Sequence, residues 1–530
     1  IDLMSDVVTS MREILPDEDA FQKVGTDPDI ITKLIQSGYT GNKGLGGFYA
    51  ETKSGKKVRD LLADNEDHDI WRDINPLPEI AEKAALAQSQ QKEALLVLIQ
   101  DNSNYGVFAR SVLAHIFCYA GQLLGSITTN PQDIDDAMKL GFNWQRGPFE
   151  MIDAIGAENL QILISDAGLT MPNALQIDRP FYQVENNHIS VFDTIKGYVG
   201  VSLPVGSFRL QILRRTLPVL AQNNDASCYQ IENDMRLVEF HSKANALRPQ
   251  TIEILKYVAD NPGRGVIIHN DAQHFSAGVD LNHFRALIET KKWQEIDDFL
   301  AEFQQAVVAL KYLNVPVVGA PSGLAIGGGF EVLAHCDALV AHVNSTFGLV
   351  ESGVGLLPAG GGVKQTYLRW FNKTGDWNQA AWQCWMQIGY GKIGTSPELS
   401  ARYCYFLDDR DVQVMNKDRV FLQAVSLNEN LQKSYLPPAK PAFRLADPQI
   451  RKKMFEFMEK GVTEGMFTPH NLTTAMAIAD VIVAKDGEQQ NVSEQDIFNR
   501  ERENFIRLAR TPETLRRIST LLDSGQAEDN

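Results

Sequence analysis

The hydrophobic pattern of the chain changes its period near residue 229, and this change limits the folds that the following residues can adopt. Short apolar runs at residues 236–240, 265–269, 315–320 and 338–341 have the length and composition of buried strands. Residues 247–258, between the first two runs, carry the pattern of an amphipathic helix. Strands that alternate with helices are typical of layered α/β domains. We therefore expect an α/β domain over residues 229–430.

The segments on either side of this domain are expected to be mainly helical. The sequence pattern predicts two helical units, over residues 1–60 and 91–176, with a linker over the charged, proline-containing residues 61–90. It also predicts a second linking segment over residues 177–228 and a helical C-terminal region over residues 431–530. Residues 152–156 are similar to residues 1–5, which indicates an internal repeat. If both helical units contain this repeat, we expect the chain to start inside the first copy of the repeat.

Composition excludes several classes of protein. Lys and Arg number 50 against 67 Asp and Glu, a formal charge of −17, so we expect no nucleic-acid partner. No apolar run reaches the roughly 18 residues that span a bilayer. Five widely spaced cysteines without CxxC spacing favour reduced thiols. These features predict a cytoplasmic protein, although import into an organelle stays open because we expect the native N-terminus to be missing.

Two glycine-rich turns follow apolar runs. The first is Ser276-Ala277-Gly278-Val279, and the second is Gly327-Gly328-Gly329 just before a helical pattern. Glycines allow a ligand to approach the backbone closely, and N–H groups at a helix start favour negative charge. Two such N–H groups facing one carbonyl oxygen would form an oxyanion hole. Tight strand-to-helix packing is the alternative explanation for either turn taken alone.

Two glutamates stand in apolar surroundings near these turns. Glu331 follows the glycine triplet between Phe330 and Val332, and Glu351 lies in a glycine-rich, mostly apolar segment. A carboxyl in such surroundings has a raised pKa and can act as an acid or a base. The alternatives are a helix-start glutamate for Glu331 and a surface-turn residue for Glu351.

No metal site is expected, and the glycine clusters at 41–47, 327–329 and 360–362 lack the GxGxxG spacing of a dinucleotide site.

Taken together, these motifs resemble the crotonase (enoyl-CoA hydratase/isomerase) family. The matching segments, in family order, are residues 241–247, 275–281, 323–337 and 347–362. The resemblance implies the α/β crotonase-like (ClpP/crotonase spiral) fold and an oxyanion hole made by the N–H groups of Val279 and Gly328. It further implies that Glu331 activates water and that Glu351 delivers the α-proton. Lys243 and Ala277 match positions at which the family binds coenzyme A.

The N-terminal part resembles a second family. The segments 134–137 and 147–150, and the glycine-rich segment 41–49, are similar to the all-α C-terminal domain of 3-hydroxyacyl-CoA dehydrogenases. That family places an NAD-binding domain with a catalytic His–Glu pair before the helical part. This chain shows no such segment, so the resemblance implies NAD only for a missing domain of the parent protein.

The order of the two resemblances is similar to that in bifunctional fatty-acid β-oxidation proteins. It predicts an enoyl-CoA hydratase that converts trans-2-enoyl-CoA to 3-hydroxyacyl-CoA, with an acyl-CoA substrate and no cofactor of its own. The resemblance also implies a homo-oligomer or an assembly with a thiolase. Two alternatives stay open: a Δ3-Δ2 enoyl-CoA isomerase, and a catalytically silent CoA-binding assembly module.

Overall fold

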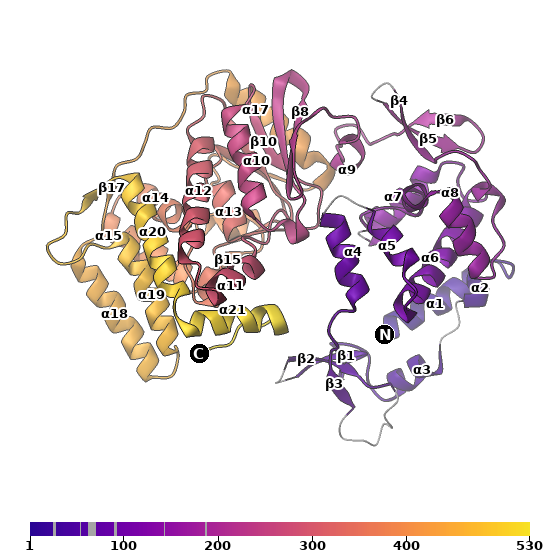
Figure 1. Ribbon diagram of the computed structural model, residues 1–530, viewed down its shortest axis with the longest axis horizontal. Coiled ribbons are helices and arrows are strands. Elements are labelled where there is room, and N and C mark those ends of the chain that lie inside the picture. Colours follow the sequence, from indigo (N-terminus) through magenta and orange to yellow (C-terminus); the bar gives the residue numbers. More distant parts are fainter. Residues whose placement is uncertain (25–27, 53–54, 62–69, 90–92, 143, 186–187) are drawn as a thin grey trace. The chain divides into compact units, whose positions relative to one another are not determined.

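A computed structural model describes residues 1–24, 28–52, 55–61, 70–89, 93–142, 144–185 and 188–530. The chain forms two compact units, the first made mainly from residues 1–179 and the second mainly from residues 180–530 (Figure 1). Each unit has a core of its own, so each is described by itself.

The first unit is a set of packed helices with a small antiparallel sheet of order β1-β2-β3. Its helices are α1 (Asp2–Ile14), α2 (Phe21–Val24), α3 (Asp29–Gln36), α4 (Glu79–Ser89), α5 (Ala94–Gln100), α6 (Asn104–Leu123), α7 (Pro131–Phe142), α8 (Pro148–Asp166) and the 3-10 turn η1 (Asn173–Leu175). Its strands are β1 (Tyr49–Thr52), β2 (Gly55–Arg59) and β3 (Trp71–Asp73). Helices α6 and α8 pack together, and Phe117 and Phe149 are both fully buried.

The expected linker over residues 61–90 contains regular structure. Residues 62–69 and 90 of that segment lie outside the described residues, but β3 and α4 fall within it. β3 pairs with β2, and Ile80 on α4 is 7% exposed. Pro76 and Pro78, which contributed to the linker prediction, lie between β3 and α4.

The start of α8 explains the spacing of one N-terminal motif. The buried carboxylate of Asp135 accepts the N–H groups of Phe149 at 2.8 Å and Glu150 at 3.2 Å, and Glu150 in turn accepts the N–H of Gly147 at 2.9 Å. These bonds satisfy helix-start donors that have no partner within the helix. A Cβ added to Gly147 would lie 2.3 Å from the Asp135 side chain, so only glycine fits there.

The second unit is built on a seven-stranded sheet of order β16-β13-β11-β10-β9-β8-β7. The strands are β7 (Val219–Gln222), β8 (Ala226–Ile231), β9 (Met235–Phe240), β10 (Val266–His269), β11 (Val317–Ala320), β13 (Ala338–His342) and β16 (Val412–Val414). β9, β10, β11, β13 and β16 are parallel, whereas β7 and β8 are antiparallel, and the sheet with its helices confirms the predicted α/β domain. The sheet thus begins before residue 229, inside the segment expected to be a linker.

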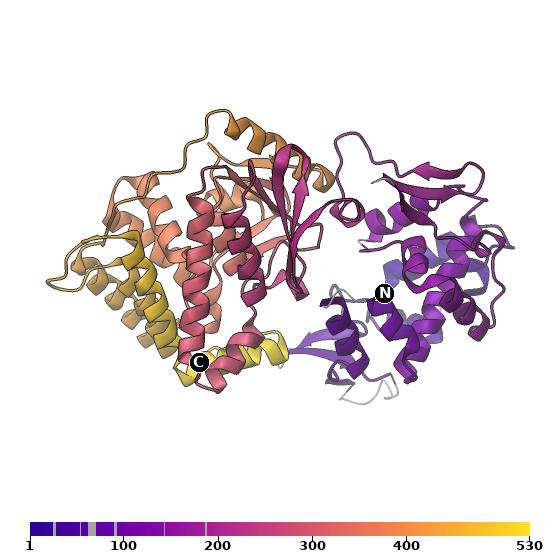
Figure 2. The same ribbon diagram turned by 45° about the horizontal axis from the view of Figure 1, so that its top comes forward.

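Both faces of this sheet are covered by helices. Val238 and Ile268 belong to the core on one face, with α10 (Pro249–Asp260) and α12 (Trp293–Lys311), whereas Leu237 and Ile267 face α17 (Val420–Gln432). Successive residues of a strand point to opposite faces, so a run that is apolar throughout is buried on both. Figures 1 and 2 show α10 and α12 together and α17 apart from them.

The remaining elements of the second unit surround this core. They are α9 (Leu210–Leu213), α11 (Leu281–Glu289), α13 (Gly328–Ala334), α14 (Gly362–Thr374), α15 (Trp377–Gly389), α16 (Pro397–Ala401), α18 (Pro448–Thr463), α19 (Pro469–Ile482), α20 (Glu494–Ala509) and α21 (Pro512–Ser524), the 3-10 turns η2 (Glu232–Asp234), η3 (Lys243–Asn245), η4 (Glu351–Val354) and η5 (Lys417–Arg419), and the strands β4 (Tyr182–Glu185), β5 (His188–Asp193), β6 (Gly197–Gly200), β12 (Leu324–Ile326), β14 (Thr346–Gly348), β15 (Ile393–Gly394), β17 (Phe443–Arg444) and β18 (Asn491–Val492). β4, β5 and β6 form a small sheet within residues 177–228.

The C-terminal helices share the core of the α/β domain. Ile478 on α19 and Phe505 on α20 are buried in the same apolar cluster as Val238 and Ile268. The region 431–530 is therefore an integral layer of this unit and not a separate tail. No helix in the described part of the chain combines the length and apolar character needed to cross a membrane.

Candidate active site

Three parallel segments bring the predicted site residues to one edge. β12 pairs in parallel with β14, and Ser276 pairs in parallel with Ala325 of β12. Val279 follows the segment that contains Ser276, Gly328 follows β12, and Glu351 follows β14. Because the carboxyl ends of parallel strands meet at the same edge, residues far apart in the sequence lie close together there.

The two glycine turns lie directly against each other. A Cβ built on Gly328 would lie 3.4 Å from the nitrogen of Val279, and one built on Gly278 would lie 3.4 Å from the nitrogen of Gly328. Gly278 has φ of +93° and Gly327 φ of +53°, conformations that glycine adopts readily. The turns therefore need glycine both for their backbone angles and for their close approach.

The amides of Val279 and Gly328 are left without protein acceptors in the described part of this unit. Val279 lies in a parallel bridge with Leu247, and the bonds of that bridge are made by its neighbours: Leu247 N–H donates to Gly278 O at 2.8 Å, and Asp280 N–H donates to Leu247 O at 3.1 Å. The N–H of Val279 consequently points away from Leu247. Gly328 is the first residue of α13, where an amide has no acceptor within its own helix.

The loop before Val279 is held by side chains that the sequence motifs did not single out. The Ser276 hydroxyl donates to Asn245 O at 2.7 Å and accepts the N–H of Gly278 at 3.1 Å. Asn245 in turn donates from its side chain to His274 O at 2.8 Å. The sequence signal was present, since Ser276 belongs to the glycine turn, but a serine there also fits a simple turn.

Glu331 is buried, and two backbone N–H groups hold its carboxylate. The N–H groups of Gly360 and Gly362 both donate to Glu331 Oε1 at 2.7 Å. Burial raises the pKa of Glu331 to about 7, although these two hydrogen bonds act in the opposite direction. Glu331 can therefore change its protonation state near neutral pH, which a surface helix-start glutamate would not do.

Glu351 is the first residue of η4 and faces the second glycine turn. A Cβ on Gly327 would lie 3.2 Å from Glu351 Oε1, and among the described residues Glu351 Oε2 is buried without a hydrogen-bond partner. Burial, and after it the charge of Glu331, raises the pKa of Glu351 to about 8. The structure thus brings together two carboxyls of different acidity beside two free backbone amides.

Lys243 and Ala277 lie side by side at the rim of this site. Both are exposed, and the N–H of Ala277 donates to the carbonyl of Ala244, next to Lys243, at 3.2 Å. Ala244 and Asn245 have φ of +55° and +51°, so the backbone turns sharply here. A cation on an exposed turn beside the candidate oxyanion amides is compatible with a ligand phosphate.

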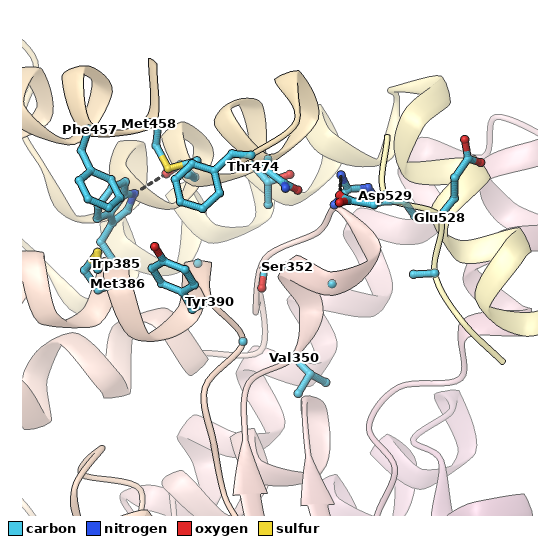
Figure 3. A pocket seen from close by; sticks show the side chains of 18 residues that line it. Val350, Ser352, Trp385, Met386, Tyr390, Phe457, Met458, Thr474, Glu528 and Asp529 are labelled. Atoms are coloured by element: carbon cyan, nitrogen blue, oxygen red, sulfur yellow. Dashed lines mark hydrogen bonds and ion pairs between the residues drawn. The ribbon is translucent and has the colours of Figure 1, made fainter. Parts of the chain in front are cut away.

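An apolar cavity of about 490 Å³ lies on the other side of the Glu351 turn. Val350 and Ser352 contribute to its lining, but Glu331 and Glu351 do not. Figure 3 shows Trp385, Tyr390 and Phe457 grouped on one side of it. The cavity adjoins the loop that carries Glu351 without containing either carboxyl.

Comparison with known protein families agrees with this arrangement. The profile of the enoyl-CoA hydratase/isomerase family matches residues 230–375, which include all six predicted site residues. The profile of the 3-hydroxyacyl-CoA dehydrogenase C-terminal domain matches residues 106–173 in the first unit. The chain joins a crotonase domain to a dehydrogenase C-terminal domain. The fold of the second unit is accordingly the crotonase-like α/β fold.

Curated proteins match nearly the whole chain. A Bacillus subtilis protein named "Probable 3-hydroxyacyl-CoA dehydrogenase" is 28% identical over 509 residues, which is 94% of this chain and 64% of that protein. A Rickettsia felis protein named as a fatty acid oxidation complex trifunctional enzyme is 27% identical over 531 residues, 98% of this chain and 66% of that protein. This chain therefore spans about two thirds of the length of these relatives.

Another relative matches a smaller part of the chain. The Bacillus subtilis protein named "Probable enoyl-CoA hydratase" is 33% identical over 128 residues, which is 23% of this chain and 48% of that protein.

The second unit does contain one GxGxxG spacing, at Gly389, Gly391 and Gly394, which the sequence-based expectation did not include. Gly389 is the last residue of α15, and Gly394 is the last residue of β15. A dinucleotide-binding turn requires the opposite order, with the strand first and the helix after it. The residues of this chain at that motif therefore do not fit NAD.

Proposed function

We propose that the crotonase domain hydrates 2-enoyl-CoA thioesters. The observation that carries this proposal is the placement of two buried carboxyls, Glu331 and Glu351, beside the unpartnered amides of Val279 and Gly328. An isomerase needs one group that moves a proton, whereas addition of water across a double bond needs a base for the water and an acid for the α-carbon. The site offers both.

The mechanism follows from these positions. The thioester oxygen accepts the N–H groups of Val279 and Gly328, which polarise the enoyl group. Ionised Glu331 takes a proton from water as the water oxygen bonds to C3, and the electron pair of the double bond moves toward the thioester oxygen. The two amides stabilise the enolate charge, an effect typically worth about 10²–10³ in rate for one donor. Protonated Glu351 then gives its proton to C2, and 3-hydroxyacyl-CoA leaves.

The coupled ionisation of the two glutamates supports a base and an acid in one site. Burial raises the pKa of Glu331 to about 7, and burial together with the charge of Glu331 raises that of Glu351 to about 8. Because the charge of Glu331 opposes ionisation of Glu351, the pair keeps one proton over a range near neutral pH. The base and the acid are thus present together near neutral pH.

The exposed Lys243 beside Ala277 supports a coenzyme A ester as the substrate. We propose that the lysine contacts a phosphate of the coenzyme at the rim of the site, while the acyl group reaches the buried carboxyls. Replacement of Lys243 by Ala should raise KM for the thioester several-fold and leave kcat near the wild-type value, because a rim charge contributes about 1 kcal/mol or less.

For the parent protein we propose a role in fatty-acid oxidation with a 3-hydroxyacyl-CoA dehydrogenase activity. The support is the dehydrogenase C-terminal domain and the names of the long relatives. NAD would then bind to a segment that this chain does not contain. A homo-oligomer, a thiolase partner and a cytoplasmic location belong to the same proposal.

The test is a measurement of enoyl absorbance after a short 2-enoyl-CoA is added to the protein. The proposal predicts loss of that absorbance by the wild type and strongly reduced loss by Glu331→Gln and by Glu351→Gln. If Glu331→Ala still converts 3-enoyl-CoA to 2-enoyl-CoA at the wild-type rate, the domain is an isomerase. If the wild type binds acyl-CoA without turnover, it is a binding module.

A further inference from the structure

The glycine turn that contacts Glu331 is held from its other side by a second buried glutamate. Glu501 on α20 accepts the N–H of Gly361 on Oε2 and the N–H of Lys364 on Oε1, both at 2.8 Å. Gly360 and Gly362 donate instead to Glu331. The backbone amides at the start of α14 are therefore divided between two carboxylates that lie far apart in the sequence.

Glu501 has no contact with solvent. It is 0% exposed, and Glu331 is 3% exposed. Burial, followed by the charge of Glu331, raises the pKa of Glu501, whereas the two amides and the charge of Lys364 lower it. Its two oxygens accept backbone amides at the start of α14, where an amide has no acceptor within its own helix. The contact is thus built into the fold.

The other charged groups around the turn are also paired. Lys364 Nζ donates to Glu494 Oε1 at 2.6 Å, and Lys311 lies 3.8 Å from the same oxygen. The ring of His335 lies against Gly361, and its Nδ1 contacts Glu331 O at 2.7 Å. The charged groups that act on Glu501 are Glu331 on α13 and Lys364 on α14.

We propose that Glu501 is a positioning residue that fixes the Gly360–Gly362 turn and thereby holds Glu331 at the reacting centre. Without its two acceptor oxygens, the amides of Gly361 and Lys364 would be buried and unsatisfied, and the turn would rearrange to reach other acceptors. Gly360 and Gly362 belong to the same turn, so Glu331 would lose its fixed geometry. This inference rests on the proposed hydratase function and assigns a role to the C-terminal helices.

The decisive variant is Glu501→Gln. Its side chain keeps one acceptor oxygen but presents a donor NH₂ to the second backbone amide, so one of the two hydrogen bonds is lost. We expect kcat for hydration of a short 2-enoyl-CoA to fall about tenfold or more while KM changes little, because small misplacements of a catalytic group are costly.

Arg500→Gln is the matched control on the same helix. Arg500 joins α20 to Asp480 and Glu488 and does not contact the glycine turn. We expect it to lower the melting temperature without moving kcat. Glu501→Asp keeps both acceptor oxygens on a shorter side chain, and we expect it to lose only part of kcat. This second variant also serves if Glu501→Gln fails to fold.

Amide hydrogen exchange separates this inference from the proposed function. Residues 360–364 should exchange faster in Glu501→Gln than in the wild type and in Arg500→Gln. If the wild type produces no 3-hydroxyacyl-CoA, the proposed function is wrong, and faster exchange in Glu501→Gln alone still supports the role of Glu501 in fixing the turn. If the wild type is active but Glu501→Gln retains its kcat and exchange rates, the inference is overturned.

Discussion

The carboxyls of Glu331 and Glu351 are buried at one edge of three parallel segments, and each opposes the ionisation of the other. Burial first, and then the charge of Glu331, raises the pKa of Glu351 to about 8. Burial raises the pKa of Glu331 to about 7, against the effect of the Gly360 and Gly362 amides. The two carboxyls lie beside the amides of Val279 and Gly328, which are left without protein acceptors in the described part of this unit.

The pH dependence of kcat/KM should form a bell with its maximum between about pH 7 and pH 8. Activity falls below this range because the base Glu331 becomes protonated, and above it because the acid Glu351 loses its proton. Initial hydration rates are measured at pH values from about two units below this range to about two units above it. A profile flat across this range would contradict the assigned roles.

Replacement of either glutamate by glutamine should lower kcat by about 10²–10⁴, the usual contribution of one acid–base group. For Glu331→Gln the structure predicts little disturbance of the fold, because both backbone donors reach the single oxygen Oε1, which glutamine retains. Circular dichroism checks the fold and steady-state kinetics the rate. A folded Glu351→Gln variant with wild-type kcat would exclude Glu351 as the acid.

Stability should depend on pH through Glu331. Its pKa in the folded protein, about 7, lies above its ordinary value of 4.5, so the folded state binds the proton more tightly than the unfolded state. This contribution is fully present below pH 4.5 and is lost as the pH rises through about 7. Glu331→Gln, which cannot ionise, should gain about 2–3 kcal/mol over the wild type at pH 8 and little at pH 4.5.

Urea denaturation at the two pH values measures this difference. An equal stability of wild type and Glu331→Gln at pH 8 would show that the buried carboxyl carries no penalty for its charge. The pKa assignment would then be wrong.

Gly278→Ala should damage the candidate oxyanion hole more than it damages the fold. The alanine must adopt φ of +93°, and its Cβ would lie 3.4 Å from the Gly328 nitrogen. We expect a loss of about 1–2 kcal/mol of stability from the left-handed backbone and a loss of kcat/KM of at least about tenfold. Gly375→Ala is the control, since Gly375 has φ of +70° with nothing within 4 Å of an added Cβ. It should cost similar stability and no activity.

In the first unit, Asp135→Ala should loosen the start of α8. The variant removes the acceptor of the Phe149 and Glu150 amides, which costs about 1–2 kcal/mol for a helix cap and more when the site is buried. Hydrogen exchange in residues 147–152 should accelerate, whereas exchange in β10 should stay unchanged. Unaltered protection of residues 147–152 would show that the cap does not stabilise this helix.

The sequence predicted the features of the second unit that depend on local pattern. Strands such as β10, with three buried apolar residues in succession, were predicted because a parallel strand covered on both faces is mostly apolar. β8 was not predicted as part of the sheet, since Ala226, Ser227 and Cys228 are small or polar and resemble a turn as readily as a strand. The local amino-acid sequence cannot show that these residues pair with β9 and become buried.

The candidate site likewise contains residues that the sequence predicted and one residue that it did not. Glu331, Glu351, Val279 and Gly328 stand in compact motifs, so their residue types and order identified them, and the structure places them beside each other. Glu501 was missed because its contacts, Gly361 and Lys364, lie 140 and 137 positions away in the sequence. A glutamate in an amphipathic helix gives no sign that it is buried against a distant turn.

The most direct test of the account is incubation of the protein with a 2-enoyl-CoA in ¹⁸O-labelled water, followed by mass spectrometry of the acyl product. Hydration by Glu331 and Glu351 predicts a 3-hydroxyacyl-CoA that carries one labelled oxygen at C3, formed by the wild type and at least about a hundredfold more slowly by Glu351→Gln. Unlabelled enoyl-CoA with a shifted double bond, or no product from a protein that binds the thioester, would contradict the account.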